Sequence, residues 1–221
     1  MSFIKKIAND KKTILSNFFS LTVLQAANYI LPLLILPYLV RILGVEKFGL
    51  VMFAQSMAVF LMIAVDFGFE ISGTREISIS RHDKEKVSQI FSSIIAVKFI
   101  LIFAWFLVLF LVVELTPRFK EDAIVYYLSF GMVVGHAIFP VWFFQGIEKM
   151  KFVTLINMLA KIIFTLLIFI VIRSESDYYL VPAFNSIGYI VAGVLGLLIS
   201  LKHTNISKPA FGMMKKLVKD S

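Results

Sequence analysis

Two lysines, Lys98 and Lys161, lie near the middle of long apolar runs. An ammonium group that faces lipid at the bilayer centre costs at least about 2.5–3.5 kcal/mol. Asn157 precedes Lys161 by four residues and therefore shares its face of a helix. The pattern predicts a polar cavity within the membrane in which Lys98, Lys161 and Asn157 bind an anionic substrate. The alternative is that the lysine stems carry their charges to the membrane surface.

Two further ionisable residues fall within apolar runs. Asp66 lies toward one end of the second run, where it either pairs with Lys98 or carries a coupling proton. An ion pair that only fastens two helices is the structural alternative. His136 is near the centre of the fourth run, and histidine is the residue type whose charge most readily changes near physiological pH. A hydrogen-bonded packing role remains open for it, and we treat Asp66 and His136 as candidate coupling or gating residues.

The first apolar run combines polar side chains with helix-kinking residues. Gln25 and Asn28 are about one turn apart, which places them on one face, where they are candidate substrate-binding residues. Pro32 and Pro37 each remove a backbone donor and crowd the preceding turn. We expect a kinked helix that lines a transport pathway and changes shape during gating, although proline is also common in membrane helices generally.

These side chains must be positioned by helices that cross a membrane. Hydrophobic residues make up 59% of the 221 residues and charged residues only 16%, and the apolar runs approach the roughly 20 residues that span hydrocarbon. Only helices satisfy their own backbone groups in lipid, and the alternation of a β-barrel strand is absent. The sequence predicts an all-α, polytopic membrane protein with six spans at about residues 18–40, 48–69, 89–113, 123–145, 152–172 and 179–201.

The formal charge of +8 is concentrated in the connections between these spans. Because basic residues near span ends are retained in the cytoplasm, the distribution predicts that both termini are cytoplasmic. It also argues against nucleic acid as a partner. Fifteen lysines and arginines fall on the predicted cytoplasmic side and five on the other. The fifteen are Lys5, Lys6, Lys11, Lys12, Arg75, Arg81, Lys84, Lys86, Lys149, Lys151, Lys202, Lys208, Lys215, Lys216 and Lys219.

Every predicted connection is short, and the longest is the loop at residues 70–88. We find no phosphate-binding glycine loop, no paired carboxylates within a span, no Ser/His/Asp grouping and no metal-binding histidine cluster. Cysteine is absent. The sequence therefore predicts no catalytic residues, no metal and no cofactor, and it does not favour an enzyme.

The last residues differ from the spans. From Ser207 to Ser221, apolar residues lie among lysines at the spacing of a basic amphipathic helix on an anionic membrane surface. A disordered C-terminus is equally compatible with this pattern. We therefore divide the chain into a membrane lobe at residues 1–201 and a cytoplasmic basic tail at residues 202–221.

Three stretches resemble the polysaccharide-export family that includes the O-antigen flippases, within the multidrug/oligosaccharidyl-lipid/polysaccharide exporter superfamily. They cover most of the chain between residues 20 and 165. The stretches are LPLLILPYLVRILGVEKFGLVMFAQS (residues 31–56), DFGFEISGTREIS (residues 66–78) and WFFQGIEKMKFVTLINMLAK (residues 142–161).

The resemblance implies a two-lobe transporter with about six helices in each lobe, of which this chain is the first. The resemblance assigns a helix that lines the transport pathway to the segment with Gln25, Asn28, Pro32 and Pro37. It also matches the family's motif positions to Asp66, Gly68, Thr74, Arg75, Gln145 and Gly146. Arg75 is thereby a gating candidate. The implied partners are membrane lipid, the missing C-terminal lobe, a glycan linked to undecaprenyl pyrophosphate and other polysaccharide assembly proteins.

The predicted function is movement of that lipid-linked oligosaccharide across the bacterial cytoplasmic membrane by alternating access. One alternative is an ion-coupled exporter of small molecules, for which acidic cavity residues would be expected. Another is a six-helix membrane partner that transports nothing. A polysaccharide polymerase is disfavoured because the outward connections are too short for a catalytic loop.

Overall fold

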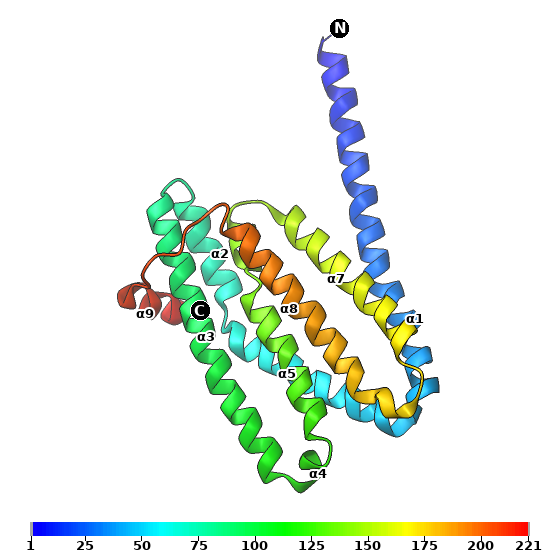
Figure 1. The fold of residues 1–221 in the computed structure, drawn as a ribbon. Helices are drawn as coiled ribbons and strands as arrows, with labels where there is room; N and C mark the ends of the chain where they lie inside the picture. Colours follow the sequence, from blue (N-terminus) through cyan, green and yellow to red (C-terminus); the bar gives the residue numbers. More distant parts are fainter. Residues whose placement is uncertain (1, 221) are drawn as a thin grey trace.

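A computed structural model describes the backbone of residues 2–220 and the side chains of residues 30 and 33–220. Within that part of the chain every regular element is a helix and no strand is found. The prediction of an all-α polytopic membrane protein is confirmed (Figure 1). The helices are α1 (Ser2–Asp66), α2 (Phe69–Ser80), α3 (Lys84–Leu115), α4 (Pro117–Lys120), α5 (Ala123–Ile138), α6 (Val141–Gly146), α7 (Met150–Val171), the 3-10 helix η1 (Glu175–Tyr179), α8 (Leu180–Ser200) and α9 (Phe211–Asp220).

Five helical stretches of the described residues are long and apolar enough to cross a membrane. The first, Leu33–Ser80, has 48 residues, which is more than twice what a bilayer requires. Within it Gly44 adopts φ 71° and ψ 168° and turns the backbone, a conformation that glycine enters without steric cost. The predicted first and second spans lie on either side of this turn, and the count of six spans stays a prediction.

The predicted loop at residues 70–88 is wrong over most of its length. Helix α1 ends at Asp66, and a turn with positive φ at Phe67 and Gly68 leads directly into α2. Its polar residues look like a loop in the sequence, but their helical spacing buries one face. The buried residues of α2 are Phe69, Ser72, Gly73, Glu76, Ile77 and Ser80. Only residues 81–83 connect α2 to α3, whose first turn is capped by the Asp83 side chain.

Pro140 divides the predicted fourth span into α5 and α6. Proline lacks an N–H group and disfavours helical geometry in the residue before it. Phe139 accordingly has extended backbone angles of φ −74° and ψ 108°. The helix therefore breaks beside His136 and starts again at Val141.

Helices α5 and α8 pack with their backbones in contact because small residues line their interface. A Cβ atom at Gly135 would overlap backbone atoms of Tyr189 and Ile190, and one at Gly193 would overlap the carbonyl oxygen of Gly135. Ser186 of α8 donates a hydrogen bond to the Leu128 carbonyl of α5. Small residues allow such backbone contact where water exclusion cannot drive helices together.

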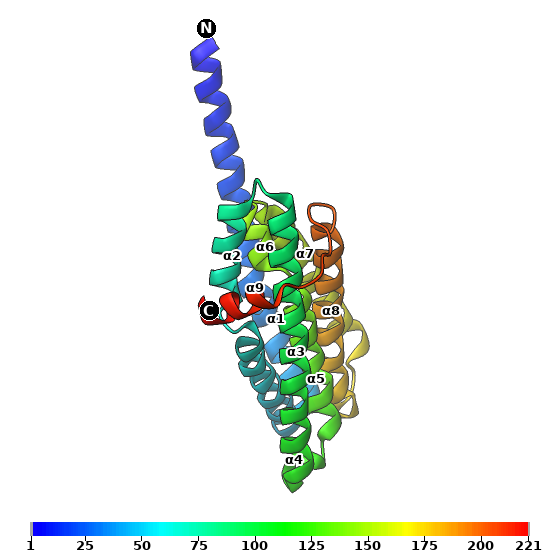
Figure 2. The ribbon, with the colours of Figure 1, turned by 90° about the vertical axis from the view of Figure 1, so that its left-hand side faces the viewer.

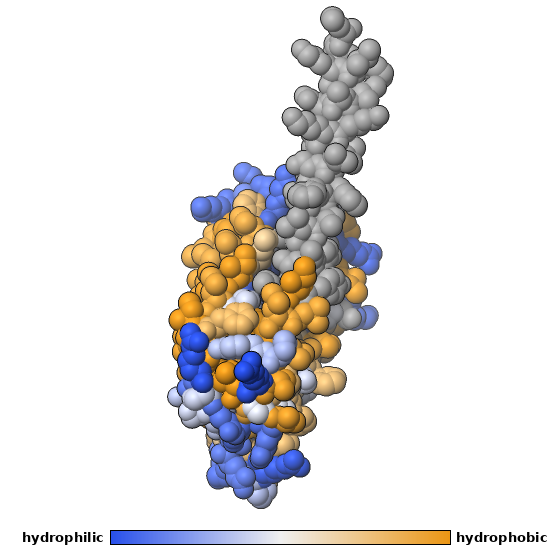
Figure 3. Space-filling view, turned by 90° about the vertical axis from the view of Figure 1, so that its right-hand side faces the viewer, coloured by the Kyte–Doolittle hydropathy of each residue, from blue (hydrophilic) through white to orange (hydrophobic). Residues whose placement is uncertain are grey.

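The bundle has two apolar cores and a lipid-facing exterior. One core joins α1, α5, α7 and α8 with the last turns of α3, and the other joins α2, α3, α6 and α9 with parts of α7 and α8 around Phe91, Trp142 and Phe143. Large apolar side chains such as Phe99 and Phe103 of α3 are exposed. Figure 3 shows a broad hydrophobic band bounded by hydrophilic surface at both ends, as expected of a protein surrounded by lipid.

The segments that connect the helices lie at two ends of the bundle, where polar contacts join them. At the end we call the basic end (residues 81–86, 147–151 and 201–204), Arg81 pairs with Glu148 at 2.8 Å. Burial lowers the pKa of His203, and the positive charges of Lys149 and Lys202 lower this pKa further. A neutral His203 thus accepts from Lys149 at 3.5 Å.

The opposite end comprises residues 44–47, 116–122 and 172–178. There Lys47 and the Tyr178 hydroxyl both bind Asp122, at 3.3 and 2.7 Å. The predicted connections therefore alternate between two ends of the bundle (Figure 1).

Replacing Gly135 by alanine tests the contact between α5 and α8. The added methyl group overlaps the α8 backbone, and overpacking of this kind costs about 1–3 kcal/mol. We expect Gly135→Ala to lower the thermal unfolding midpoint of the detergent-solubilised chain by at least about 3 °C. The matched control Gly49→Ala, where a Cβ atom meets nothing within 4 Å, should leave the midpoint unchanged or raise it. Equal midpoints for the two variants would contradict the packing described above.

Candidate functional site

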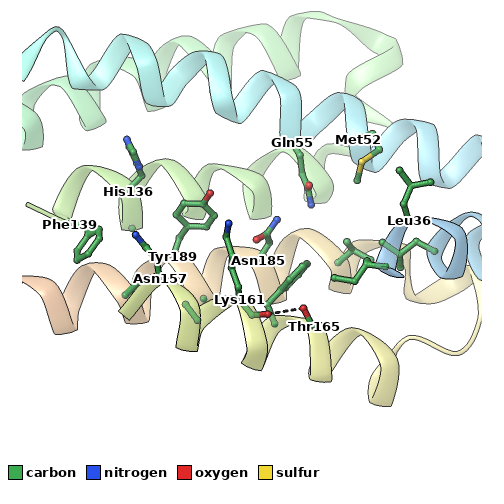
Figure 4. A pocket seen from close by; sticks show the side chains of 18 of the residues that line it. Leu36, Met52, Gln55, His136, Phe139, Asn157, Lys161, Thr165, Asn185 and Tyr189 are labelled. Carbon is green, nitrogen blue, oxygen red and sulfur yellow. Dashed lines mark hydrogen bonds between the residues drawn. The ribbon is translucent and has the colours of Figure 1, made fainter. Parts of the chain in front are cut away.

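A cavity of about 540 Å³ lies among α1, α5, α7 and α8. Its volume falls in the usual range for ligand pockets. Most of its wall is apolar, and a few polar groups converge on it (Figure 4). The lining residues are Ile35, Leu36, Leu39, Phe48, Met52, Gln55, Gly135, His136, Phe139, Val141, Asn157, Ala160, Lys161, Phe164, Thr165, Val181, Asn185, Gly188, Tyr189 and Ala192.

The polar groups of the described lining come from four helices, of which α5 contributes His136. Lys161 and Asn157 belong to α7 and Asn185 to α8, while Gln55 projects from α1 on the facing side (Figure 4). The amide nitrogen of Gln55 is buried and has no hydrogen-bond partner among the described residues. A buried donor without a partner is costly, so this amide is available to a ligand.

The charge of the cavity is positive. Lys161 lies at the midpoint of the 22-residue α7 and is exposed, and the described lining includes His136 but neither aspartate nor glutamate. At this depth a cation is far less screened than in water. Three amide side chains and the hydroxyl groups of Tyr189 and Thr165 add hydrogen-bonding groups to the described lining. The cavity therefore suits an anionic, hydroxyl-bearing ligand better than a cationic one.

A buried ionic cluster adjoins the cavity. Lys98 of α3, whose side chain is only 3% exposed, donates to Asp66 at 2.5 Å, and the other Asp66 oxygen lies 2.7 Å from His136 Nε2. Asp66 is the last residue of α1, immediately before the Phe67 turn. The cluster thus ties α1, α3 and α5 together. His136 is the member that also lines the cavity.

The candidates from the sequence fall into four groups. Lys161, Asn157 and His136 line the cavity. Lys98 and Asp66 form the adjoining ion pair and do not belong to the described lining. Pro37 and Arg75 are exposed, on α1 and α2. The remaining candidates, whose side chains lie outside the described residues, are Gln25, Asn28 and Pro32.

Two of the motifs quoted from the sequence contact each other near the basic end. The Thr74 hydroxyl of α2 lies 3.0 Å from the side-chain oxygen of Gln145 and 3.2 Å from the Trp142 carbonyl oxygen, both in the α6 segment. A Cβ atom at Gly146 would lie 2.5 Å from the Ile77 side chain, so the two helices require glycine there. These motif residues therefore join α2 to α6 and stand apart from the cavity.

Sequence reasoning missed Asn185 and Tyr189 as cavity residues. A helical turn apart on the last span, they form a polar pair of the same kind as Asn157 and Lys161. It also missed Gly131 and Gly135, whose GMVVG spacing is a known signal for close packing of membrane helices. Among the described residues, no group of three His, Asp or Glu side chains is placed to hold a metal ion.

Comparison with known proteins identifies the family. A family model described as "Polysaccharide biosynthesis protein" matches residues 14–221. The chain is 35% identical over 199 residues to a protein of Escherichia coli (strain K12) named "Putative O-antigen transporter", a match that covers 90% of this chain and 48% of that protein. It is 31% identical to a Shigella dysenteriae protein of the same name, with coverage of 85% and 47%.

The chain spans about half the length of the curated relatives it matches. No solved structure matches it. The family model covers nearly the whole sequence, and the three quoted motifs lie within the matched residues. The chain belongs to the polysaccharide biosynthesis protein family.

Proposed function

We propose that this chain forms one lobe of a membrane transporter that moves a lipid-linked oligosaccharide from the cytoplasmic to the outer leaflet of the bacterial cytoplasmic membrane. The proposed substrate is a glycan on undecaprenyl pyrophosphate, such as an O-antigen or capsule repeat unit. In this proposal the basic end faces the cytoplasm, because lysine and arginine are retained on that side. No covalent bond is made or broken.

The cationic cavity is the observation that carries the proposal. A pyrophosphate with attached sugars cannot enter hydrocarbon unless protein groups replace its hydration shell. Lys161 offers a cation, and the amides of Gln55, Asn157 and Asn185 offer hydrogen bonds to sugar hydroxyls. The absence of carboxylates from the described lining disfavours a cationic drug as the substrate. The polyprenyl chain would remain in the surrounding lipid.

Transport requires the cavity to open to each side of the membrane in turn. Lys161 and Asn157 are exposed in this chain, and the matched relatives are about twice its length. We therefore propose that a second lobe faces these residues and that alternating access occurs between the two lobes. Gln25 and Asn28 of the first helix are proposed to extend the same binding surface, and Pro32 and Pro37 to let that helix bend.

The ionic cluster is proposed to couple occupancy of the cavity to the helix arrangement. His136 contacts both the cavity and Asp66, and Asp66 stands at the turn between α1 and α2. A ligand that draws His136 toward itself would weaken the Asp66 contact and release α1 from α5. Arg75, farther along α2, is a gating candidate on the basis of its motif alone.

Removing the charge of Lys161 should block transport. A hydrogen bond to a charged group contributes about 1.5–3 kcal/mol, so Lys161→Met should weaken substrate binding roughly 10- to 100-fold. With the substitution placed in the chromosomal gene, we expect surface polysaccharide to fall at least about tenfold while the lipid-linked precursor accumulates in the membrane. Both quantities can be measured by immunoblot and by mass spectrometry of extracted lipids.

Two controls accompany this variant. Lys161→Arg keeps the charge and should retain most surface polysaccharide. Lys151→Met removes an exposed lysine from the start of the same helix, outside the cavity lining, and should behave as wild type. Unchanged surface polysaccharide in Lys161→Met, at a normal protein level in the membrane, would refute the cavity assignment.

The cluster is tested by removing one charge and then both. Lys98→Met leaves the Asp66 carboxylate partly buried without its lysine, a loss that costs about 3–5 kcal/mol in buried pairs. We expect little folded protein in the membrane. The double variant Asp66→Asn with Lys98→Met removes both charges and should restore the folded amount.

Transport by the double variant shows whether the ion pair only fastens α1 to α3 or also couples the cavity to the helices. If Asp66 couples the cavity to the helices, the folded double variant should still yield at least about tenfold less surface polysaccharide than wild type, the effect of losing a charged hydrogen bond. Wild-type polysaccharide from the double variant would show that the ion pair only fastens α1 to α3.

A further inference from the structure

The C-terminal helix α9 lies across α2 and α3, in the half of the bundle that holds the basic end (Figure 2). After α8 ends at Ser200, residues 201–210 lead to α9 without regular structure. This helix stands outside the cavity and has no part in the proposed transport chemistry. Part of the surface of this amphipathic helix packs against the protein, and the rest is exposed.

Serines of α3 fix the depth of the segment that leads to α9. The Ser88 hydroxyl accepts a hydrogen bond from the backbone N–H of Asn205 at 3.2 Å. The hydroxyls of Ser92 and Ser93 accept from the backbone N–H groups of Ser207 at 2.9 Å and Ala210 at 3.4 Å. Ser93 is the last residue of the polar part of α3, which runs on from residue 94 in almost purely apolar sequence. Helix α9 therefore begins level with the boundary between the polar and apolar parts of α3.

Two contacts fix the rotation of α9 about its own axis. Leu217 is fully buried in the core that joins α2, α3 and α6. Lys216 pairs with Glu76 of α2 at 2.9 Å. With these neighbours on one side, the other residues of α9 have defined positions around the helix.

An apolar edge and a basic edge remain outside these contacts. Phe211 is 80% exposed and Val218 is 39% exposed, and their spacing of seven residues places them on one edge. Lys215 and Lys219, four residues apart, form the adjacent edge and are exposed. An exposed phenylalanine beside a pair of lysines at the level of a membrane boundary matches a helix that lies in the lipid interface.

We propose that α9 is an interfacial anchor that binds the anionic lipid surface at the basic end. Phe211 and Val218 lie among the acyl chains, and Lys215 and Lys219 contact anionic headgroups. Lipid is favoured over a protein partner because the apolar edge begins at the level of Ser93, where the apolar sequence of α3 starts, and exposed apolar side chains of α3 follow from Phe99 onward. The lysines complement the negative charge of the leaflet. The anchor holds the linker against α3 whether or not the chain transports a glycan.

Site-directed spin labelling of the 221-residue chain tests the anchor, because the chain has no cysteine and one introduced cysteine is unique. Val218→Cys probes the apolar edge, and Gly212→Cys probes an exposed position on a different face. Each labelled chain is reconstituted in phosphatidylcholine vesicles with or without phosphatidylglycerol. We expect the label at Val218 to collide preferentially with oxygen when phosphatidylglycerol is present, and the label at Gly212 to collide with a water-soluble nickel complex.

The lysines are tested in the same labelled chain. A lysine near an anionic surface contributes a factor of about five to binding. Lys215→Gln with Lys219→Gln should therefore lower the ratio of inserted to detached Val218 label up to about thirtyfold in phosphatidylglycerol vesicles. The matched control Lys84→Gln with Lys86→Gln removes the same charge about 10–13 Å farther along α3 from Ser93 and should leave the ratio unchanged.

Three results would overturn the proposal. A label at Val218 that reaches the nickel complex as readily as the label at Gly212, in phosphatidylglycerol vesicles, would show that α9 lies in water. A label shielded from both oxygen and nickel would show that protein covers the edge. Equal insertion with and without phosphatidylglycerol would show that anionic lipid has no part in it.

Discussion

A charge placed in hydrocarbon must find a partner, and the ion pair between Asp66 and Lys98 is where this constraint shapes the bundle most strongly. The lysine is almost completely buried on α3, and the carboxylate ends the long helix α1. Because neither charge can reach water cheaply, α1 and α3 must meet at this point. His136 brings α5 into the same cluster. Three helices far apart in the sequence are thereby fixed relative to one another.

The cavity follows from how the remaining helices pack around this cluster. Glycines let the backbones of α5 and α8 touch, and Pro140 ends α5 just beyond His136. Helix α7 lies beside α8 and directs Lys161 into the space that the other helices leave. The two lysines therefore have different positions, since Lys98 pairs with Asp66 and Lys161 lines the cavity.

The motif residues at the basic end have a structural explanation of their own. Thr74 and Gln145 bind each other, and Gly146 permits the contact of α2 with α6. These residues hold together the segments that flank the Asp66 turn and the Pro140 break. The family motifs in this chain therefore mark joints between helices and also carry cavity residues, because Gln55 lies in the first motif and Asn157 and Lys161 lie in the third. The serines of α3 extend the same end to α9 through backbone hydrogen bonds.

The sequence by itself determined that the chain is helical, that it crosses a membrane and that its connections alternate between a basic and a less basic side. These properties depend on composition and on the length of apolar runs, which are local. It also determined that Lys98 and Lys161 require polar surroundings, because a charge in lipid is costly wherever it faces. The family was evident from three motifs.

Only the tertiary structure decided which lysine lines the cavity. Lys98 and Lys161 have the same setting in the sequence, and their difference arises from the rotation of α3 and α7 toward different neighbours. That rotation depends on contacts between distant residues, such as Asp66 with Lys98 and Gly135 with Tyr189. The same reason explains why the sequence does not predict Asn185 as a cavity residue or residues 70–80 as a helix. A side chain's face has meaning only once the helices beside it are known.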